Sequence, residues 1–212
     1  MKTLSTFLAI TVLAISSFGM AQAAEKHLFY LHGCCIKDKE DPKVKVYETV
    51  VQRLRDDGFK VHFEMRYAGI GDNDAAVQAH AARIADEVRS LLAKGISPEN
   101  ITVAGYSLGS MTALVASGLL ENPKVNFVFL AGCPVNSRIK VTIDYKKIAG
   151  RALSVYDAKD VKFGSCKGHV PDAALKKEIV LNSGEGHDIF KKIDEQHMKT
   201  WKDPLVSWAK NI

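Results

Sequence analysis

Along the chain, short and almost continuously apolar segments alternate with longer amphipathic segments. Short apolar runs bounded by turn residues are typical of strands that are buried on both faces of a parallel sheet. The segments predicted as strands are His27–Leu31, Lys60–Met65, Ile101–Ala104, Val125–Ala131, Ala152–Tyr156 and Glu178–Asn182. The pattern therefore predicts a mostly parallel sheet of about six strands.

The amphipathic segments between these strands are predicted as helices. They are Pro42–Asp57, Asp74–Lys94, Leu108–Glu121, Pro171–Lys177 and Asp194–Lys210. Gly58 and Gly95 follow the first two, and glycine is common immediately after a helix. Strands that alternate with helical crossovers indicate a three-layer α/β/α sandwich. Because no repeat or linker interrupts residues 24–212, we expect them to form a single domain.

The first 23 residues have the features of an export signal. Lys2 precedes an apolar run from Phe7 to Ile15, and Ala21-Gln22-Ala23 provides a small-x-small cleavage site. The run is too short for a membrane-spanning helix, which needs about 20 apolar residues. We therefore expect a signal peptide over residues 1–23, no membrane span after its cleavage, and a periplasmic or secreted protein.

The charges argue against one class of partner. The chain has 29 Lys and Arg against 24 Asp and Glu, a formal net charge of +5. The basic residues are spread along the sequence and do not cluster with aromatic residues, as they do in many nucleic-acid-binding proteins. We therefore expect no nucleic-acid partner.

The strongest local motif is Gly105-Tyr106-Ser107-Leu108-Gly109, which lies between a predicted strand and a predicted helix. A serine on such a sharp turn is held in strained backbone, with its hydroxyl exposed at the carboxyl edge of the sheet. Glycines on both sides prevent collisions with the neighbouring strand and helix. A Gly-Ser turn that only opens a helix is the structural alternative.

From Leu28 to the last helix, the sequence resembles a small member of the α/β-hydrolase superfamily. The resemblance rests on the turn at Ser107, on His32-Gly33 after the first strand, and on an acid and a histidine in the expected order. It implies that Ser107 is a nucleophile and that no cofactor is needed. It also implies an oxyanion hole formed by the backbone N–H groups of Leu108 and Cys34.

A serine nucleophile needs a base. His187 lies in the glycine-rich segment NSGEGHDIF after the last predicted strand, where the superfamily has its catalytic histidine. His169, in the preceding loop, is the main rival. Three other histidines have ordinary structural positions, in a strand or in helical segments: His62, His80 and His197.

The acid that orients the histidine is expected after the fifth predicted strand, in SVYDAKDVKFG. Related sequences often have Gly-x-x-Asp here. Asp157 occupies the position of that glycine and Asp160 that of the acid, so we favour Asp160 and keep Asp157 as the alternative. The resulting order, Ser107, Asp160, His187, is the order that the fold uses.

This set of residues predicts acyl transfer, with hydrolysis of a carboxylic ester as the main hypothesis. A thioester or an amide is the nearest alternative substrate, and a non-catalytic binding protein on the same scaffold is the alternative of another class. The short connection Cys133–Gly150 leaves no room for a large cap, which favours a small-molecule ester with a short or exposed acyl group. The loop Arg66–Ala76 is predicted to form another wall, where Arg66 is a candidate contact for an anion.

The four cysteines suit an exported protein. Cys133 and Cys166 follow neighbouring predicted strands, so a disulfide between them is geometrically reasonable. A bond between Cys34 and Cys35 would close a strained ring and is the rarer arrangement. The alternative to disulfides is a metal site, and its candidate ligands are His32, Cys34, Cys35, Cys166 and His169. No paired C-x-x-C or H-E-x-x-H motif supports that site, so we expect no metal.

Overall fold

The structure is a computed structural model that describes residues 24–67 and 73–211. The predicted signal peptide, residues 1–23, and residues 68–72 of the predicted wall loop lie outside the described residues. Six parallel strands form one sheet in the order β2-β1-β3-β4-β6-β8. The strands are β1 His27–Leu31, β2 Lys60–His62, β3 Ile101–Tyr106, β4 Asn126–Leu130, β6 Arg151–Asp157 and β8 Leu175–Leu181.

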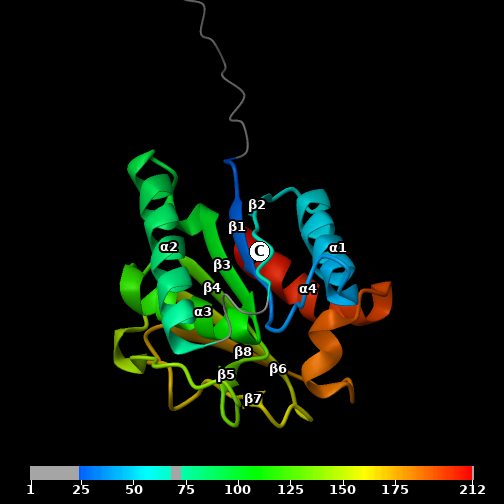
Figure 1. Ribbon diagram of the computed structural model, residues 1–212. Helices are drawn as coiled ribbons and strands as arrows, with labels where there is room; N and C mark the ends of the chain where they lie inside the picture. Colours follow the sequence, from blue (N-terminus) through cyan, green and yellow to red (C-terminus); the bar gives the residue numbers. More distant parts are fainter. Residues whose placement is uncertain (1–23, 68–72, 212) are drawn as a thin grey trace, which may run out of the picture.

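Helices cover both faces of this sheet, as Figure 1 shows. Helices α2 (Asp74–Ala93) and α3 (Leu108–Leu120) pack together on one face. Helices α1 (Pro42–Asp56) and α4 (Glu195–Lys210) lie on the other, where Lys202 pairs with Asp57 at the end of α1. The predicted three-layer α/β/α sandwich is thereby confirmed.

The strand order places a switch point beside β1. The chain passes from β1 to β2 on one side and then returns to β3 on the other side. The loops that leave β1 and β3 therefore diverge at the carboxyl edge, and ligands of open α/β sheets bind at such a point. The register pairs Leu31 with Gly105, so the segment after Leu31 and Ser107 emerge close together. Both strands are completely buried, which gives these loops a rigid support.

One predicted helix is wrong. In place of a helix over Pro171–Lys177, residues 171–174 form a turn closed by the Ala174 N–H on the Pro171 carbonyl, and β8 begins at Leu175. The segment allows barely two helical turns, which are unstable in isolation. Pairing of β8 with β6 completes the sheet and overrides the helix propensity of its alanines, leucine and lysines.

A second, two-stranded sheet at the carboxyl edge was not predicted. Strand β5 (Cys133–Pro134) pairs antiparallel with β7 (Phe163–Gly164). This pairing joins the loop that follows β4 to the loop that follows β6. Strands of two residues are too short to show the alternation of apolar and polar residues that predicts a strand. None of the described helices has both the length and the apolarity of a membrane span.

Candidate active site

Ser107 stands on a strained turn between β3 and α3. Its backbone angles are φ 57° and ψ −115°, a conformation that non-glycine residues rarely adopt outside functional sites. Flanking glycines make the turn sterically feasible. A Cβ on Gly105 would lie 2.0 Å from the Gly109 carbonyl oxygen, and one on Gly109 would lie 1.9 Å from that of Leu31. Both positions therefore exclude a side chain.

The structure brings the three predicted catalytic side chains into one hydrogen-bonded chain. The Oγ of Ser107 lies 2.8 Å from Nε2 of His187. On the other side of the ring, Nδ1 of His187 lies 2.6 Å from Oδ2 of Asp160. These side chains come from the loops after β3, β8 and β6. The carboxylate fixes the tautomer with hydrogen on Nδ1, so that Nε2 is free to accept the serine proton.

Asp160 is held rigidly behind the histidine. Its side chain is completely buried, and its Oδ1 accepts hydrogen bonds from the backbone N–H groups of Lys162 and Phe163. Those two bonds occupy one carboxylate oxygen and leave the other for His187. The loop after β6 is therefore folded around this carboxylate, which cannot turn away without losing both bonds.

Asp157 has a different position. It is buried at the end of β6, where it accepts hydrogen bonds from the N–H and hydroxyl of Ser183 and from the N–H of Lys159. Burial favours the protonated form, but these bonds outweigh it and lower the pKa of Asp157 below its ordinary value. Asp157 thus joins the loops that carry Asp160 and His187, without a contact to the imidazole.

The imidazole of His187 is packed between aromatic rings. Phe163 stacks on it with a centroid distance of 5.0 Å, and Tyr106 lies at 5.2 Å. The Tyr106 hydroxyl also donates a hydrogen bond of 3.0 Å to the His187 carbonyl. His187 stands in the short 3-10 helix η3 (Gly186–Lys191), and Gly186 enters it with φ 58°. The rival His169 instead packs against Tyr145, at 5.4 Å.

The loop after β1 is anchored through His32. Its Nδ1–H donates to the Gly33 carbonyl at 2.6 Å, and its Nε2 accepts from the Arg66 N–H at 2.8 Å. The Arg66 guanidinium also donates to the His32 carbonyl. Arg66 therefore fixes this loop, and its predicted role as a contact for an anionic substrate is not supported by these bonds.

Two backbone donors face the same region. Cys34 follows the His32-Gly33 turn, and Leu108 is the first residue of α3, where helix N–H groups have no partner within the helix. Neither N–H donates to another group among the described residues. Ser107, Leu108 and Cys34 all line one cavity. Since neither donor has an acceptor among the described residues, both are available to a ligand oxygen in this cavity.

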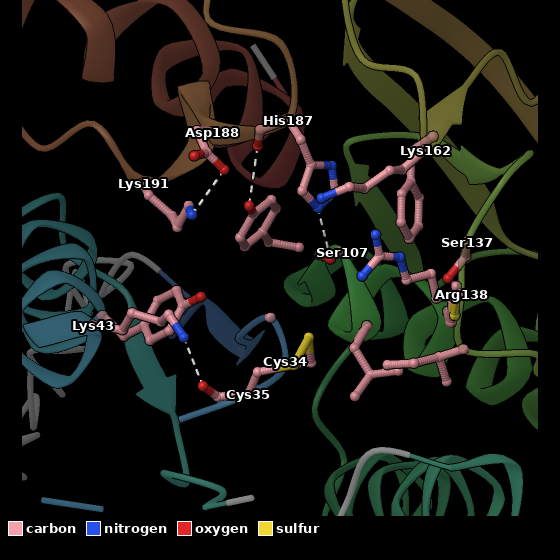
Figure 2. Close-up of a pocket in the computed structure, with 17 residues that line it drawn as sticks. Cys34, Cys35, Lys43, Ser107, Ser137, Arg138, Lys162, His187, Asp188 and Lys191 are labelled. Atoms are coloured by element: carbon pink, nitrogen blue, oxygen red, sulfur yellow. Dashed lines mark hydrogen bonds and ion pairs between the residues drawn. A yellow bond between two sulfur atoms is a disulfide. The ribbon is translucent and has the colours of Figure 1, made fainter. Parts of the chain in front are cut away.

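That cavity has a volume of about 410 Å³, and its lining residues follow the carboxyl ends of β1, β3 and β6. Figure 2 shows Ser107 and His187 facing it, with the Cys34–Cys35 disulfide on the opposite wall. Met111 and Phe163 supply apolar lining. Its size falls in the range of small-molecule sites, roughly 300–1,000 Å³.

All four cysteines form disulfides. Cys133 is joined to Cys166, the pair considered from the sequence, and the bond ties β5 to the loop after β7. Cys34 is joined to Cys35, the arrangement that we considered the rarer one. Cys35 adopts φ 68°, and Lys43 donates to its carbonyl, so the neighbouring backbone also supports this geometry.

The disulfides leave no free thiolate for the metal-site alternative. Across residues 24–67 and 73–211, no three His, Cys, Asp or Glu side chains are arranged to hold a metal ion. His32 is saturated by its two hydrogen bonds and His169 lies against Tyr145. The predicted ligands of a metal site are therefore not gathered at one point.

Comparison with protein-family models and with curated protein sequences gave no match. Solved structures do match. The chain is similar to SOBER1 from Arabidopsis thaliana, with 16% identity over 89% of this chain and 99% of that chain and a TM-score of 0.56. A Xanthomonas campestris protein assigned as a hydrolase of the alpha/beta superfamily gives 16% identity, 89% and 100% coverage and a TM-score of 0.54.

A third similar structure is a carboxylesterase from Mesorhizobium loti, with 16% identity over 85% of this chain and 88% of that chain and a TM-score of 0.53. At these identities the likeness establishes the fold. The protein has the α/β-hydrolase fold in a small form, as the resemblance in its sequence implied.

Replacing Cys34 with alanine is expected to keep most of any hydrolytic activity, because the backbone N–H remains. We expect kcat/KM for a simple ester to fall less than about tenfold, whereas loss of an oxyanion donor costs about 10²–10³-fold. Steady-state kinetics of Cys34→Ala beside the wild type measure this. A loss of the larger size would mean that the Cys34 sulfur, through its disulfide to Cys35, is essential to the site.

Acid is expected to destabilise the protein from about pH 6.5 downward. Burial, assisted by Arg66, lowers the pKa of His32 to about 3, and burial with Arg66 and Arg83 lowers that of His80 to about 3. Between pH 6.5 and 3 the unfolded chain binds protons at these histidines and the native chain does not. The free energy of unfolding therefore falls with pH, by up to about 1.4 kcal/mol per pH unit for each histidine.

Urea unfolding at about pH 7 and about pH 5 measures this effect, since ordinary carboxyl groups do not titrate in that interval. His80→Gln should show a smaller difference between the two pH values than the wild type. His197→Gln is the matched control, because His197 lies near the surface and bonds to Asp194. Equal stability of the wild type at both pH values would contradict the expectation.

Proposed function

We propose that this protein is a serine hydrolase that cleaves carboxylic esters through an acyl-enzyme on Ser107. The observation that carries the proposal is the hydrogen-bonded chain from Ser107 through His187 to Asp160, 2.8 and 2.6 Å long at its two contacts, on a strained strand-to-helix turn. A buried serine beside an imidazole that a carboxylate orients is the arrangement that activates a hydroxyl as a nucleophile.

In the first half-reaction, Ser107 Oγ attacks the ester carbonyl carbon and its proton passes to Nε2 of His187. Asp160 stabilises the imidazolium that forms. The negative charge moves to the carbonyl oxygen, which accepts hydrogen bonds from the N–H groups of Leu108 and Cys34. The bond to the leaving alcohol then breaks, and His187 returns the proton to the alcohol oxygen.

In the second half-reaction, water takes the place of the alcohol. His187 removes a proton from the water as it attacks the acyl carbon, and the same two N–H groups stabilise the second oxyanion. Collapse of this intermediate releases the acid and restores the proton to Ser107. The proton transfers in both half-reactions use the hydrogen-bonded chain of Ser107, His187 and Asp160.

The site favours short acyl groups. Between β4 and β6 the chain forms only the two-residue strand β5 and the 3-10 helix η2 (Tyr145–Lys147), so no cap of the kind found on larger hydrolases extends the cavity. A cavity of about 410 Å³ holds a small ester, whereas much of a long acyl chain would remain outside it.

Hydrolysis of a series of 4-nitrophenyl esters, from acetate to dodecanoate, tests this proposal. We expect the highest kcat/KM for acyl chains up to about six carbons, and a decrease of more than about tenfold at dodecanoate, because the additional methylenes remain outside the cavity. Failure to hydrolyse any of these esters would favour the non-catalytic binding protein. A preference for matched thioesters or anilides would keep the mechanism and correct the substrate.

We also propose that the enzyme works in the periplasm or outside the cell, on the basis of the predicted signal peptide. Two disulfides, with no free cysteine in the described part of the chain, support an oxidising compartment. Cell fractionation with N-terminal sequencing tests this. We expect a mature chain that begins at Ala24, and a full-length chain retained in the cytoplasm would contradict the proposal.

A further inference from the structure

The cavity beside Ser107 is surrounded by positive charge. Four of its lining residues are cationic, and only one, Asp188, is acidic. They are Lys43, Arg138, Lys162 and Lys191. In the whole chain basic and acidic residues are nearly balanced, at 29 to 24, so this local excess does not reflect the composition.

Two of the four cations are already engaged. Lys191 forms an ion pair of 2.7 Å with Asp188, and Lys43 donates to the Cys35 carbonyl at 2.6 Å. Burial opposes ionisation of Asp188, but the hydrogen bond and charge of Lys191, with smaller effects of His187 and Lys162, lower its pKa. This single carboxylate therefore stays ionised and is committed to Lys191.

Arg138 and Lys162 remain. Neither side chain forms a hydrogen bond or an ion pair with another residue in the described ranges. Figure 2 shows both on the side of the cavity opposite Lys43 and Lys191, and it shows the guanidinium of Arg138 directed towards Ser107. Two cations without a partner among residues 24–67 and 73–211 thus lie at one side of the nucleophile.

The backbone that carries these two cations is fixed. Arg138 follows β5, and Lys162 directly precedes β7. These two strands pair antiparallel with each other. The N–H groups of Val135 and Asn136 both donate to the Lys162 carbonyl at 3.0 Å, and a disulfide joins Cys133 to Cys166. The two loops therefore form one cross-linked unit. Isolated surface lysines have no such support, and a fixed backbone limits the entropy lost when the side chains bind a ligand.

Arg138 and Lys162 are exposed residues that line the cavity, so their charges reach both the solvent and a ligand in the cavity. A guanidinium presents paired donors that match a carboxylate or phosphate, and an ammonium adds a point charge. An uncharged ester offers these two cations no charge to bind. An ester that carries an anion satisfies both.

We propose that the natural substrate is an ester that bears an anionic group, a carboxylate or a phosphate, and that Arg138 and Lys162 bind this group while Ser107 attacks the ester. The inference rests on the proposed function and specifies its substrate class. Arg138 and Lys162 are positioning residues, because they hold the substrate and do not contact the reacting carbonyl.

Matched pairs of esters test the inference. The first pair carries the charge on the alcohol side: the butyrate esters of 3-hydroxybenzoate and of 3-hydroxybenzamide. The second pair carries it on the acyl side: 4-nitrophenyl hydrogen adipate and 4-nitrophenyl hexanoate. The butyrate ester of 3-hydroxyphenyl phosphate distinguishes a phosphate from a carboxylate. The readout is the ratio of kcat/KM for the charged ester to that for its uncharged partner.

For the wild type we expect this ratio to reach at least about tenfold in one of the two ester pairs, the one charged on the alcohol side or the one charged on the acyl side. The ratio should decrease as salt is added. In the double variant Arg138→Gln/Lys162→Gln the ratio should fall to about one. Arg55→Gln removes an exposed cation of α1 outside the cavity and should keep the ratio of the wild type.

The rates with uncharged esters distinguish failure of the anion site from failure of the proposed function. If they are hydrolysed but the charged partners are not preferred, or if the double variant keeps the preference, the anion site is wrong and the hydrolase stands. If no ester of either kind is hydrolysed, the proposed function fails and this inference fails with it.

Discussion

Replacing Ser107 with alanine is expected to lower kcat for ester hydrolysis by about 10⁵–10⁶-fold, close to the uncatalysed rate apart from the contribution of the oxyanion hole. The reason is that the hydroxyl beside His187 is the only atom that can form the acyl-enzyme in this account. The measurement is steady-state hydrolysis of 4-nitrophenyl butyrate by the purified variant.

The matched control is Ser90→Ala, which removes an exposed hydroxyl of α2 far from the cavity and should leave kcat unchanged. Thermal unfolding of Ser107→Ala should stay near that of the wild type, because alanine fits the same turn. A properly folded Ser107→Ala protein with more than about one per cent of the activity would exclude the serine mechanism.

Replacing Asp160 with asparagine is expected to lower kcat by about 10⁴-fold while KM changes little. An amide cannot stabilise the imidazolium, and its NH₂ group favours the tautomer with hydrogen on Nε2, which cannot accept the Ser107 proton. The shape of the site is retained, so substrate binding should be affected much less than turnover.

Asp157→Asn provides the comparison. Asp157 joins two loops and does not contact His187, so we expect mainly a loss of stability, roughly 1–3 kcal/mol for a weakened buried hydrogen-bond network, with kcat reduced less than about tenfold. Kinetics and urea unfolding of both variants measure the contrast. If Asp157→Asn abolishes turnover and Asp160→Asn does not, the acid has been assigned to the wrong residue.

The central part of the fold could be predicted from the sequence because buried strands are apolar on both faces. The strand His27–Leu31 was located with its observed bounds for this reason. The turn at Ser107 was recognisable because two glycines at fixed spacing are a steric requirement, which the contacts at Gly105 and Gly109 explain. An element could be predicted from its own sequence wherever the contacts that determine its structure are local.

Long-range contacts could not be predicted in the same way. Pairing with β6 makes the segment from Leu175 a strand, and the pairing of β5 with β7 depends on two loops about 30 residues apart. Arg66 bonds to His32 across 34 positions, so the sequence alone does not reveal its role as an anchor and suggests a contact with the substrate instead. Arg138 and Lys162 had no local signal, because only the folded loops place them at the cavity.

The central claim is that Ser107 is a nucleophile activated by His187. Reaction with a fluorophosphonate probe, followed by mass spectrometry of the intact protein and of its peptides, tests this claim most directly. We predict one probe per chain, attached to Ser107, no labelling of Ser107→Ala, and strongly slowed labelling of His187→Ala. Labelling that persists in Ser107→Ala, or a wild-type protein that is not labelled at all, would contradict the account.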